Sequence, residues 1–487
     1  MKKITDSCED NVKLLKSILT SQDILVFAFE TKDGAPCAAV YADGMTDKAL
    51  LGEQIARPLS QTAAPKTPKD APKLLQAPEI KEEDDPDKLA DEVLAGNTAL
   101  FIDGVCGALV AGMKKLSLRA IMEPPGAVAV KGPREGFIED MKTNMSLVRN
   151  RLRTPKLQFK TLTAGRQSKT AIAVGYIEGI ADDKVVSEIE KKIGSIDIDG
   201  IPDSSYVAKF LAERPYSLFK AAGTTEKPDV LAAKMLEGRV AVIVDGSPIA
   251  LTLPYLLVED FQGAQDYFVS PYRASVSRLL RFIGVFVSIF LPAFYVAAQL
   301  FKLQILPLSF LLTIAGSIQG IPLSPSLELF FLLLVLEILV EASVRMPKYV
   351  ALALSVIGAL VLGDTAVKAG LVSSSAIIIM ALSGISAYTV PDLVGTMSIL
   401  RIAFVVVAGS IGTYGVLLMT ALVLYYMTTA DAYGAPMLAP FSPLVRRDLK
   451  DSLLKTSMYG LRKRPKVFRT KNETRLNAEK EETHGQD

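Results

Sequence analysis

The sequence predicts a cytosolic α/β region made of two related subdomains, followed by an α-helical polytopic membrane domain and a polar tail. Half of the 487 residues are hydrophobic, yet only eleven charged residues fall between Phe282 and Pro440. Before that stretch, two kinds of segment each occur twice in the same order. The predicted parts are an N-terminal segment (1–22), the subdomains (23–122 and 123–275), the membrane domain (276–440) and a cytosolic basic and polar tail (441–487).

The repeated segments indicate that the two subdomains share one fold. The first kind is an apolar β-run, a Gly turn, an acidic residue suited to cap a helix, and an amphipathic helix. The second is a β-hairpin turning at Asp-Gly, the dipeptide favoured in type I′ turns, which explains Asp103 and Asp245 as turn residues. The pairs are Ala38–Ile55 with Ile172–Ile193, and Thr98–Val110 with Val240–Leu253.

Two polar stretches are predicted to lie outside the packed cores. Residues 57–92 form an insertion rich in proline and charge within the first subdomain, and this composition predicts a flexible chain. After Arg447 the chain is polar again. We interpret this segment either as a solvated tail or as a tail whose basic first part contacts anionic lipid.

Composition argues against several kinds of chemistry. The one histidine, His484, lies in the tail, and Cys8, Cys37 and Cys106 have neither disulfide nor zinc spacing. The segment Thr163–Thr170, TAGRQSKT, lacks the spacing of a phosphate loop. A net charge of +2 does not indicate a nucleic-acid partner. We therefore predict no enzyme activity, no cofactor, no metal and no nucleic acid, and we see no signal peptide at the start.

Six apolar runs follow residue 281. Three meet the ~20 residues that a helix needs to cross a bilayer core, namely Phe282–Phe301, Gly370–Val390 and Ile402–Met427. Tyr349–Gly363 is short but can be extended through Thr365–Ala369. Two shorter runs are interpreted as short spans, re-entrant pieces or interfacial helices, namely Ile305–Ile318 and Leu327–Val340. We predict four to six spans. Basic residues before the first run and after the last place both termini in the cytoplasm by the positive-inside rule, and these are Arg273, Arg278, Arg281, Arg446, Arg447 and Lys450.

Charged residues among the apolar runs are the candidate pore or gating residues. Glu337, Glu341 and Arg345 are spaced four apart and share one helix face. A central carboxylate costs up to about 3 kcal/mol in a bilayer and one Leu returns only ~0.5 kcal/mol. One possibility is that Glu341 and Arg345 pair at the membrane interface beside Lys348. The other is that the stripe formed by Glu337, Glu341 and Arg345 faces a protein interior or a watery pathway, with Glu337 deepest in the membrane.

Three more charges belong to this candidate set. Asp364 and Lys368 form a further pair four residues apart, in a solvated connection or within the membrane. Glu328 reads as a helix N-terminal charge facing the dipole or as a group at a pore mouth.

One long segment, Glu123–Arg153, resembles the hallmark of the A-subunit family of spore germination receptors, the GerA family. It reads EPPGAVAVKGPREGFIEDMKTNMSLVRNRLR, and Lys131 stands where that family usually has Arg. The resemblance continues in further segments from about residue 20 to about residue 465. Val340, Asp364 and Lys368 depart from the family pattern of Arg, Glu and Gln. The matching residues are Gly132, Pro133, Arg134, Glu135, Gly136, Phe137, Asn144, Arg149 and Arg151.

The resemblance implies a subunit of a nutrient germinant receptor in the inner membrane of a bacterial endospore. Its implied partners are a transporter-like B subunit, a lipoprotein C subunit, membrane lipid and further copies of this chain around a central ion pathway. In such a ring Glu337 and Glu341 would form acidic rings suited to cations. The alternative is a non-conducting, membrane-anchored scaffold that recruits other germination proteins. A secondary transporter is disfavoured because the membrane part shows no inverted repeat.

The polar residues of the family segment have two interpretations. They form a structural turn with helix capping and surface charges, or they form a docking surface between protomers or between a subdomain and the membrane helices. On the second interpretation they transmit motion to the pore. These coupling candidates are Lys131, Arg134, Glu135, Asn144, Arg149 and Arg151.

Overall fold

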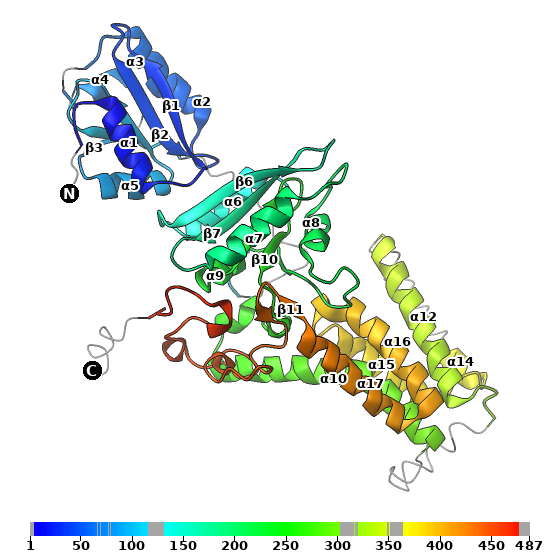
Figure 1. Ribbon diagram of the computed structural model, residues 1–487. Helices are drawn as coiled ribbons and strands as arrows, with labels where there is room; N and C mark the ends of the chain where they lie inside the picture. The colour runs from blue at the N-terminus through cyan, green and yellow to red at the C-terminus, as the bar shows by residue number, and fades with distance from the viewer. Residues whose placement is uncertain are drawn as a thin grey trace. The chain divides into compact units, whose positions relative to one another are not determined.

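The computed structural model describes residues 4–476 except 66, 69, 76, 78, 115–130, 302–315, 317–319, 348–349 and 351–363. The chain forms two compact units. The first comprises Met1–Leu256, Ala432–Ala435 and Met458–Asp487, and the second comprises Leu257–Asp431 and Pro436–Ser457. Two α/β subdomains followed by a helical region with apolar helices confirm the predicted fold class (Figure 1).

The first subdomain is a five-stranded antiparallel sheet with helices on both faces. Its strands lie in the order β1-β2-β4-β5-β3. Its elements are α1 (Cys8–Ile18), β1 (Ile24–Glu30), β2 (Pro36–Ala42), α2 (Lys48–Leu51), the π-helical turn η1 (Gly52–Ala56), α3 (Arg57–Gln61), α4 (Ala71–Leu74), β3 (Ile80–Glu83), α5 (Pro86–Leu94), β4 (Thr98–Ile102) and β5 (Ala108–Ala111).

The second subdomain repeats this topology, so the inferred relation between the two is present in the fold. Its strands lie in the order β6-β7-β9-β10-β8, and all neighbours are again antiparallel. Its elements are α6 (Met141–Arg151), β6 (Leu157–Ala164), β7 (Thr170–Ile177), α7 (Asp183–Gly194), α8 (Ser204–Leu211), β8 (Gly223–Thr225), α9 (Pro228–Leu236), β9 (Val240–Val244) and β10 (Ala250–Leu253).

Alternation along the strands builds a core on each face of each sheet. In β2, Val40 packs with Leu15 and Val93 of α1 and α5, whereas Ala39 faces the other cluster. This follows from the two-residue period of a strand. The second cluster is completed by apolar side chains of α2, η1, α3 and the chain around α4, including Leu51, Ile55, Leu59, Ala71 and Leu75.

The prediction that residues 57–92 form a flexible insertion is therefore wrong for the residues of this segment that the structure describes. Leu59, Ala71 and Leu75 are buried, and Ile80–Glu83 pairs with Ala108–Ala111 as strand β3. The composition misled because a few apolar residues, spaced among prolines and charges, are enough to cover one face of a sheet that already exists.

The two predicted hairpins, β4–β5 and β9–β10, are present, but their Asp-Gly pairs do not form type I′ turns. That turn needs positive φ at both central residues, and only Gly104 (φ 78°) and Gly246 (φ 84°) have it. Asp103 Oδ1 instead accepts a hydrogen bond from the Cys8 N–H (3.0 Å), and Asp245 Oδ1 accepts one from the Met141 N–H (3.1 Å). Each aspartate thus satisfies a free amide at the N-terminus of its subdomain's first helix.

A second pair of equivalent residues fixes the chain that enters each first helix. Asn11 bonds both the N–H and the carbonyl of Thr5, and Asn144 bonds both the N–H (2.9 Å) and the carbonyl of Ile138. An amide side chain suits this task because it carries one acceptor and one donor. Asn144 is therefore explained by local structure, in line with the first interpretation of the family segment.

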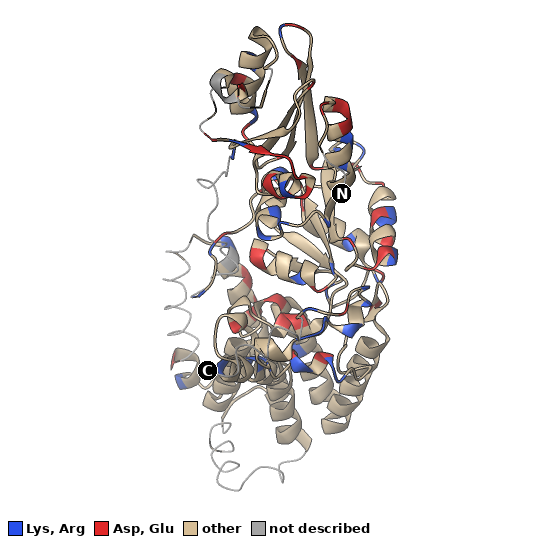
Figure 2. Ribbon diagram, turned by 90° about the vertical axis from the view of Figure 1, so that its left-hand side faces the viewer, with Lys and Arg blue, Asp and Glu red and all other residues tan. Residues whose placement is uncertain are grey.

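The second unit is a bundle of apolar helices. Its long helix α10 packs against α15 and α16, with the Phe290 and Phe404 rings 5.0 Å apart. In the ribbon of Figure 2, the colours of charged residues are frequent on the α/β subdomains and sparse on the bundle helices. The elements from Leu257 onward are η3 (Leu257–Phe261), η4 (Ala264–Tyr267), α10 (Pro271–Phe301), α12 (Pro325–Arg345), α14 (Ala366–Lys368), α15 (Ser374–Ala387), η7 (Pro391–Leu393), α16 (Val394–Ile411), α17 (Thr413–Thr429), β11 (Asp431–Ala432), β12 (Ala435–Pro436), η8 (Asp448–Lys450), η9 (Met458–Gly460) and η10 (Lys466–Phe468).

The single span predicted for Ile402–Met427 is two helices. The chain turns at Gly412, whose φ is 74°, and a Cβ there would lie 2.7 Å from the Phe301 ring. Only glycine combines that backbone conformation with so close an approach. Within the described residues, two helical stretches, Pro271–Phe301 and Pro391–Ile411, are long and apolar enough to cross a membrane. The runs Ile305–Ile318 and Tyr349–Gly363 lie almost wholly outside the described residues.

The tail is not simply solvated, because its described residues after Ser457 pack on the second subdomain. Phe468 is buried, and the Arg239 guanidinium lies 4.5 Å from the centre of its ring. Arg464 Nε donates to the Leu236 carbonyl (2.7 Å). The chain thus returns to the α/β unit after the bundle.

The paired hydrogen bonds of Asn144 generate a first prediction. Asn144→Ala leaves the partly buried N–H and carbonyl of Ile138 without their side-chain partner, which should lower the free energy of unfolding by about 1–3 kcal/mol. Asn150→Ala is the matched control, because Asn150 lies on the same helix and its side chain makes no hydrogen bond among the described residues. Denaturant titration of the purified protein, followed by circular dichroism, measures both. Equal losses in the two variants would contradict this role.

Candidate functional site

The candidate pore residue Glu337 pairs with a buried arginine on another helix. Its Oε1 accepts a hydrogen bond from Arg401 Nη2 of α16 at 2.6 Å, and Arg401 is only 4 % exposed. Arg401 Nη1 also donates to Ser383 Oγ of α15 (3.1 Å), and Ser383 donates to the Ser288 carbonyl of α10 (2.7 Å). One network therefore joins four helices of the bundle.

Arg401 was missed at the sequence level, although a signal existed. It is the one basic residue in the apolar stretch from Val394 to Met427. A lone charge in such a stretch is costly in hydrocarbon and needs a partner. The sequence did not show that this partner lies 64 residues earlier, on α12.

The other charged pairs of the candidate set are local and exposed. Arg345 Nε donates to Glu341 Oε1 at 2.8 Å, and Lys368 Nζ lies 2.6 Å from Asp364 Oδ2. Both pairs join residues four apart on one helical face, as expected from their spacing. All four side chains are more than half exposed in this chain.

Three members of the stripe open into one hollow of about 550 Å³ on the surface of α12. Glu337, Glu341 and Arg345 line it on one side, and apolar side chains supply the rest. The apolar lining residues are Phe330, Leu333, Leu334, Ile338, Ala342 and Ile402. The arrangement places two compensated carboxylates on a surface that is otherwise apolar.

Glu328 lies apart from this stripe and is completely buried. One of its carboxylate oxygens accepts a hydrogen bond from the Ser373 N–H, at the N-terminus of α15. The charge therefore faces the dipole of a neighbouring helix as well as that of its own helix.

The coupling candidates separate into three environments. Arg149 is buried, and its Nε and Nη2 bond the two carboxylate oxygens of Asp23 at 2.6 and 2.8 Å. It is therefore not a surface charge; it joins the second subdomain to the chain that enters the first sheet. Arg151 and Glu135 form a partly exposed pair (2.6 Å), whereas Lys131 and Arg134 are exposed.

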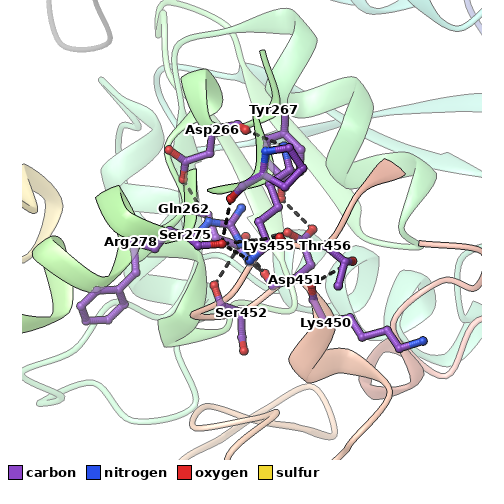
Figure 3. Close-up of polar contacts among 12 residues, drawn as sticks. Gln262, Asp266, Tyr267, Ser275, Arg278, Lys450, Asp451, Ser452, Lys455 and Thr456 are labelled. Carbon is purple, nitrogen blue, oxygen red and sulfur yellow. Dashed lines mark hydrogen bonds and ion pairs between the residues drawn. The ribbon is translucent and has the colours of Figure 1, made fainter. Parts of the chain in front are cut away.

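A buried polar cluster at the start of α10 was not foreseen (Figure 3). Arg278 is fully buried and bonds Asp266 Oδ2 (3.0 Å), Asp451 Oδ1 (2.9 Å) and the carbonyls of Asp451 and Ser452. Arg281 bonds both carboxylate oxygens of Asp266. The positive-inside argument counted Arg278 and Arg281 as flanking charges, but each is compensated within the protein.

The same cluster ties the chain after the bundle to the start of α10. Tyr267 Oη donates to Asp451 Oδ2 (2.9 Å), and Lys455 Nζ donates to the Asp266 carbonyl. Burial by itself would raise the pKa of the Asp266 carboxyl, but hydrogen bonds and charge from Arg281 and Arg278 outweigh it and lower that pKa. Burial lowers the pKa of the Lys455 ammonium.

The described parts of the chain contain no group of three or more His, Cys, Asp or Glu residues that could hold a metal ion. The polar clusters instead consist of carboxylates with arginine, lysine and hydroxyl partners, an arrangement that positions helices and chain segments.

Comparison with known proteins identifies the class. The family model of the Bacillus/Clostridium GerA spore germination proteins matches residues 12–467. Spore germination protein KA of Bacillus subtilis (strain 168) is 32% identical over 468 residues, which are 94% of this chain and 86% of that protein. The uncharacterized membrane protein YfkQ of the same organism is 31% identical over 472 residues, covering 96% and 92%.

Among solved structures, the N-terminal domain of the A subunit of the Bacillus megaterium spore germinant receptor GerK3 is 28% identical to this chain. It has a TM-score of 0.41, and the match covers 53% of this chain and 98% of that domain. The class defined by the family match is that of spore germination proteins. Within it, this chain belongs to the GerA family, which confirms the resemblance found in the sequence.

The buried Asp23–Arg149 pair generates a second prediction. Asp23→Asn leaves the Arg149 guanidinium buried without an opposite charge, which should lower the free energy of unfolding by about 3–5 kcal/mol. Glu135→Gln removes the carboxylate of the more exposed pair with Arg151 and should cost at most about 1 kcal/mol. Denaturant titration compares the two. Similar small losses would mean that the buried pair does not hold the subdomains together.

The Asp266 cluster predicts a pH dependence. Because its folded pKa is lowered, Asp266 contributes stability that is present above the ordinary pKa of about 4 and is lost as pH falls through the folded value. Asp266→Asn should therefore lower Tm most near pH 7, and the difference from wild type should shrink below about pH 4. Thermal unfolding between pH 7 and 3 tests this. Asp431→Asn, at an exposed position, is the control; a pH-independent difference for Asp266→Asn would refute the argument.

Proposed function

We propose that this protein is the A subunit of a nutrient germinant receptor in the inner membrane of the endospore. It crosses that membrane several times with both termini in the cytoplasm. The family match, the membrane-protein relative and the apolar bundle support this placement. Large apolar side chains are exposed along α10, α12 and α17, among them Leu280, Phe286, Leu327, Phe331, Leu418 and Leu422. Such continuous apolar surface needs lipid or another subunit to cover it.

The proposed assembly contains several copies of this chain together with a transporter-like B subunit, a lipoprotein C subunit and bound membrane lipid. The B subunit binds the nutrient, and the copies of this chain surround an ion pathway. We infer these partners from the resemblance of the sequence to the GerA family. Exposed apolar faces on several helices of one bundle leave room for both lipid and subunit contacts.

The observation that carries the conduction proposal is the single hollow on α12 that Glu337, Glu341 and Arg345 line together. Facing lipid, these charges would be costly; facing a watery axis between copies, they would be hydrated. The proposed axis is therefore lined by α12, and rings of Glu337 and Glu341 attract monovalent cations when the channel opens.

The pairing of Glu337 with Arg401 adds a gating element to this proposal. While the pair is closed, the arginine neutralises the deepest carboxylate of the stripe. A displacement of α12 relative to α16 would separate the two groups and expose the negative charge to the pathway. Nutrient binding in the partner subunit supplies that displacement.

The alternative function is a non-conducting scaffold, with the α/β unit recruiting other germination proteins and the bundle serving as an anchor. It is favoured by one specific observation, the exposed local pair of Glu341 with Arg345, which is the arrangement expected at a headgroup interface. A spore whose bundle is exchanged for an unrelated anchor distinguishes the two. Normal cation release in that spore supports the scaffold, and loss of release supports conduction.

Charge neutralisation tests the conduction mechanism directly. Glu337→Gln with Glu341→Gln should reduce cation release from nutrient-stimulated spores by roughly tenfold or more, because the attractive rings lose their charge. Cation release is measured in the medium by flame photometry, with protein level checked by immunoblot. Glu188→Gln, which removes an exposed charge from α7, is the control. Unchanged release and germination in the double variant would remove the acidic-ring mechanism.

A further inference from the structure

Glu328 is a buried carboxylate of the bundle, and no basic side chain in the described part of the chain bonds to it. It is 0 % exposed, and one carboxylate oxygen accepts the Ser373 N–H. The other oxygen, Oε2, makes no hydrogen bond to any part of the chain that the structure describes. On the same helix, the carboxylate of Glu337 is neutralised by Arg401. The two carboxylates of α12 thus differ: the partly exposed Glu337 pairs with Arg401, whereas the fully buried Glu328 has no cationic partner among the residues that the structure describes.

Other polar groups lie in the same part of the bundle. Ser375 Oγ donates to Ser373 Oγ (3.3 Å), and Tyr295 Oη of α10 lies 2.6 Å from Ser375 Oγ. A chain of hydroxyl groups therefore runs from the Glu328 contact at Ser373 to α10. One turn beyond Tyr295 on the same face, Gln299 is 8 % exposed, and neither its amide oxygen nor its amide nitrogen has a partner among the described residues.

The start of α12 and the second half of α10 both pack closely on α16. A Cβ on Gly409 of α16 would lie 2.8 Å from Ser326 of α12 and 3.9 Å from Val296 of α10. Val296 is three residues before Gln299 on the same face of α10, whereas Ser326, two residues before Glu328, lies on a different face of α12 from that carboxylate. The glycine thus lets the start of α12 approach the second half of α10, while Glu328 itself contacts the N-terminus of α15.

The charge at this position is incompletely balanced. The N-terminus of α15 offers the equivalent of roughly half a positive charge. A buried carboxylate needs full compensation, because an unpaired ion in an apolar interior is very costly. Within the described residues Glu328 supplies the one carboxylate at this position, so a single positive charge balances it. The available ligand atoms are oxygens of a carboxylate, an amide and hydroxyls, which suit a hard cation.

We propose that Glu328, Gln299, Tyr295 and Ser375 form a binding site for one monovalent cation inside each protomer. Glu328 Oε2 supplies the charge, and Gln299 Oε1 with the two hydroxyl oxygens supplies further ligands. The bound ion does for Glu328 what Arg401 does for Glu337 and ties α10, α12 and α15 together. The site lies within one chain and does not rest on conduction along an axis between copies.

Thermal unfolding of the detergent-solubilised full-length protein tests this site. Tm is measured by circular dichroism in sodium or potassium chloride and in N-methyl-D-glucamine chloride at equal ionic strength. Sodium or potassium should raise the Tm of the wild type by about 2–4 °C once its concentration exceeds Kd roughly fivefold. Glu328→Gln should abolish this rise, and its Tm in N-methyl-D-glucamine should not fall below that of the wild type, because the neutral amide can still accept the Ser373 N–H.

Two further variants keep the test decisive. Gln299→Leu should move the cation midpoint upward by about tenfold or more, and it decides the question if Glu328→Gln does not fold. Asp431→Asn, at an exposed position of the second unit, should keep the full rise. Equal Tm of the wild type in all three salts would show that Glu328 holds a proton or water, and would overturn the proposal. A full rise retained in both Glu328→Gln and Gln299→Leu would place the cation elsewhere, with the same consequence.

Discussion

A charged group removed from water must be compensated, and both units of this protein depend on that constraint. In the bundle, Glu337 meets Arg401 across two helices, and Glu328 meets the N-terminus of α15. At the start of α10, Asp266 lies between Arg278 and Arg281. The two pairings in the bundle join helices whose paired residues are 64 and 45 residues apart, whereas Asp266 lies only 12 and 15 residues from its two arginines. The apolar side chains then fill the space between these groups.

Equivalent positions of the two α/β subdomains make different contacts. Lys16 on α1 and Arg149 on α6 each donate to the carbonyl of the first residue of the following strand, Ile24 and Leu157 respectively. Only the arginine also reaches Asp23, because its planar group offers several donors in a fixed arrangement. The equivalent position thus holds a single-point donor in the first subdomain and, in the second, a forked donor that also bonds Asp23.

Particular residues show which features of the site could be predicted from the sequence. The pairing of Glu341 with Arg345, and of Asp364 with Lys368, follows from a spacing of four on a helix. The partner of Glu337 does not, because 64 residues separate it from Arg401. The same limit applies to the Asp-Gly pairs: their hairpins were predicted, but the contact of Asp103 with the start of α1 spans 95 residues. The break at Gly412 was missed because hydropathy alone does not report a positive φ.

By itself the sequence determined the two-part organisation, the internal duplication, the family and the helical face shared by Glu337, Glu341 and Arg345. These features depend on composition, on local periodicity and on the order of short sequence motifs, all of which can be read along the chain without knowledge of the packing. Tertiary structure alone decided which distant group compensates each buried charge, that residues 57–92 contribute to a core, and that the tail returns to the second subdomain. Those outcomes depend on which surfaces meet when helices and sheets pack, and packing brings together residues whose separation along the chain carries no local signal.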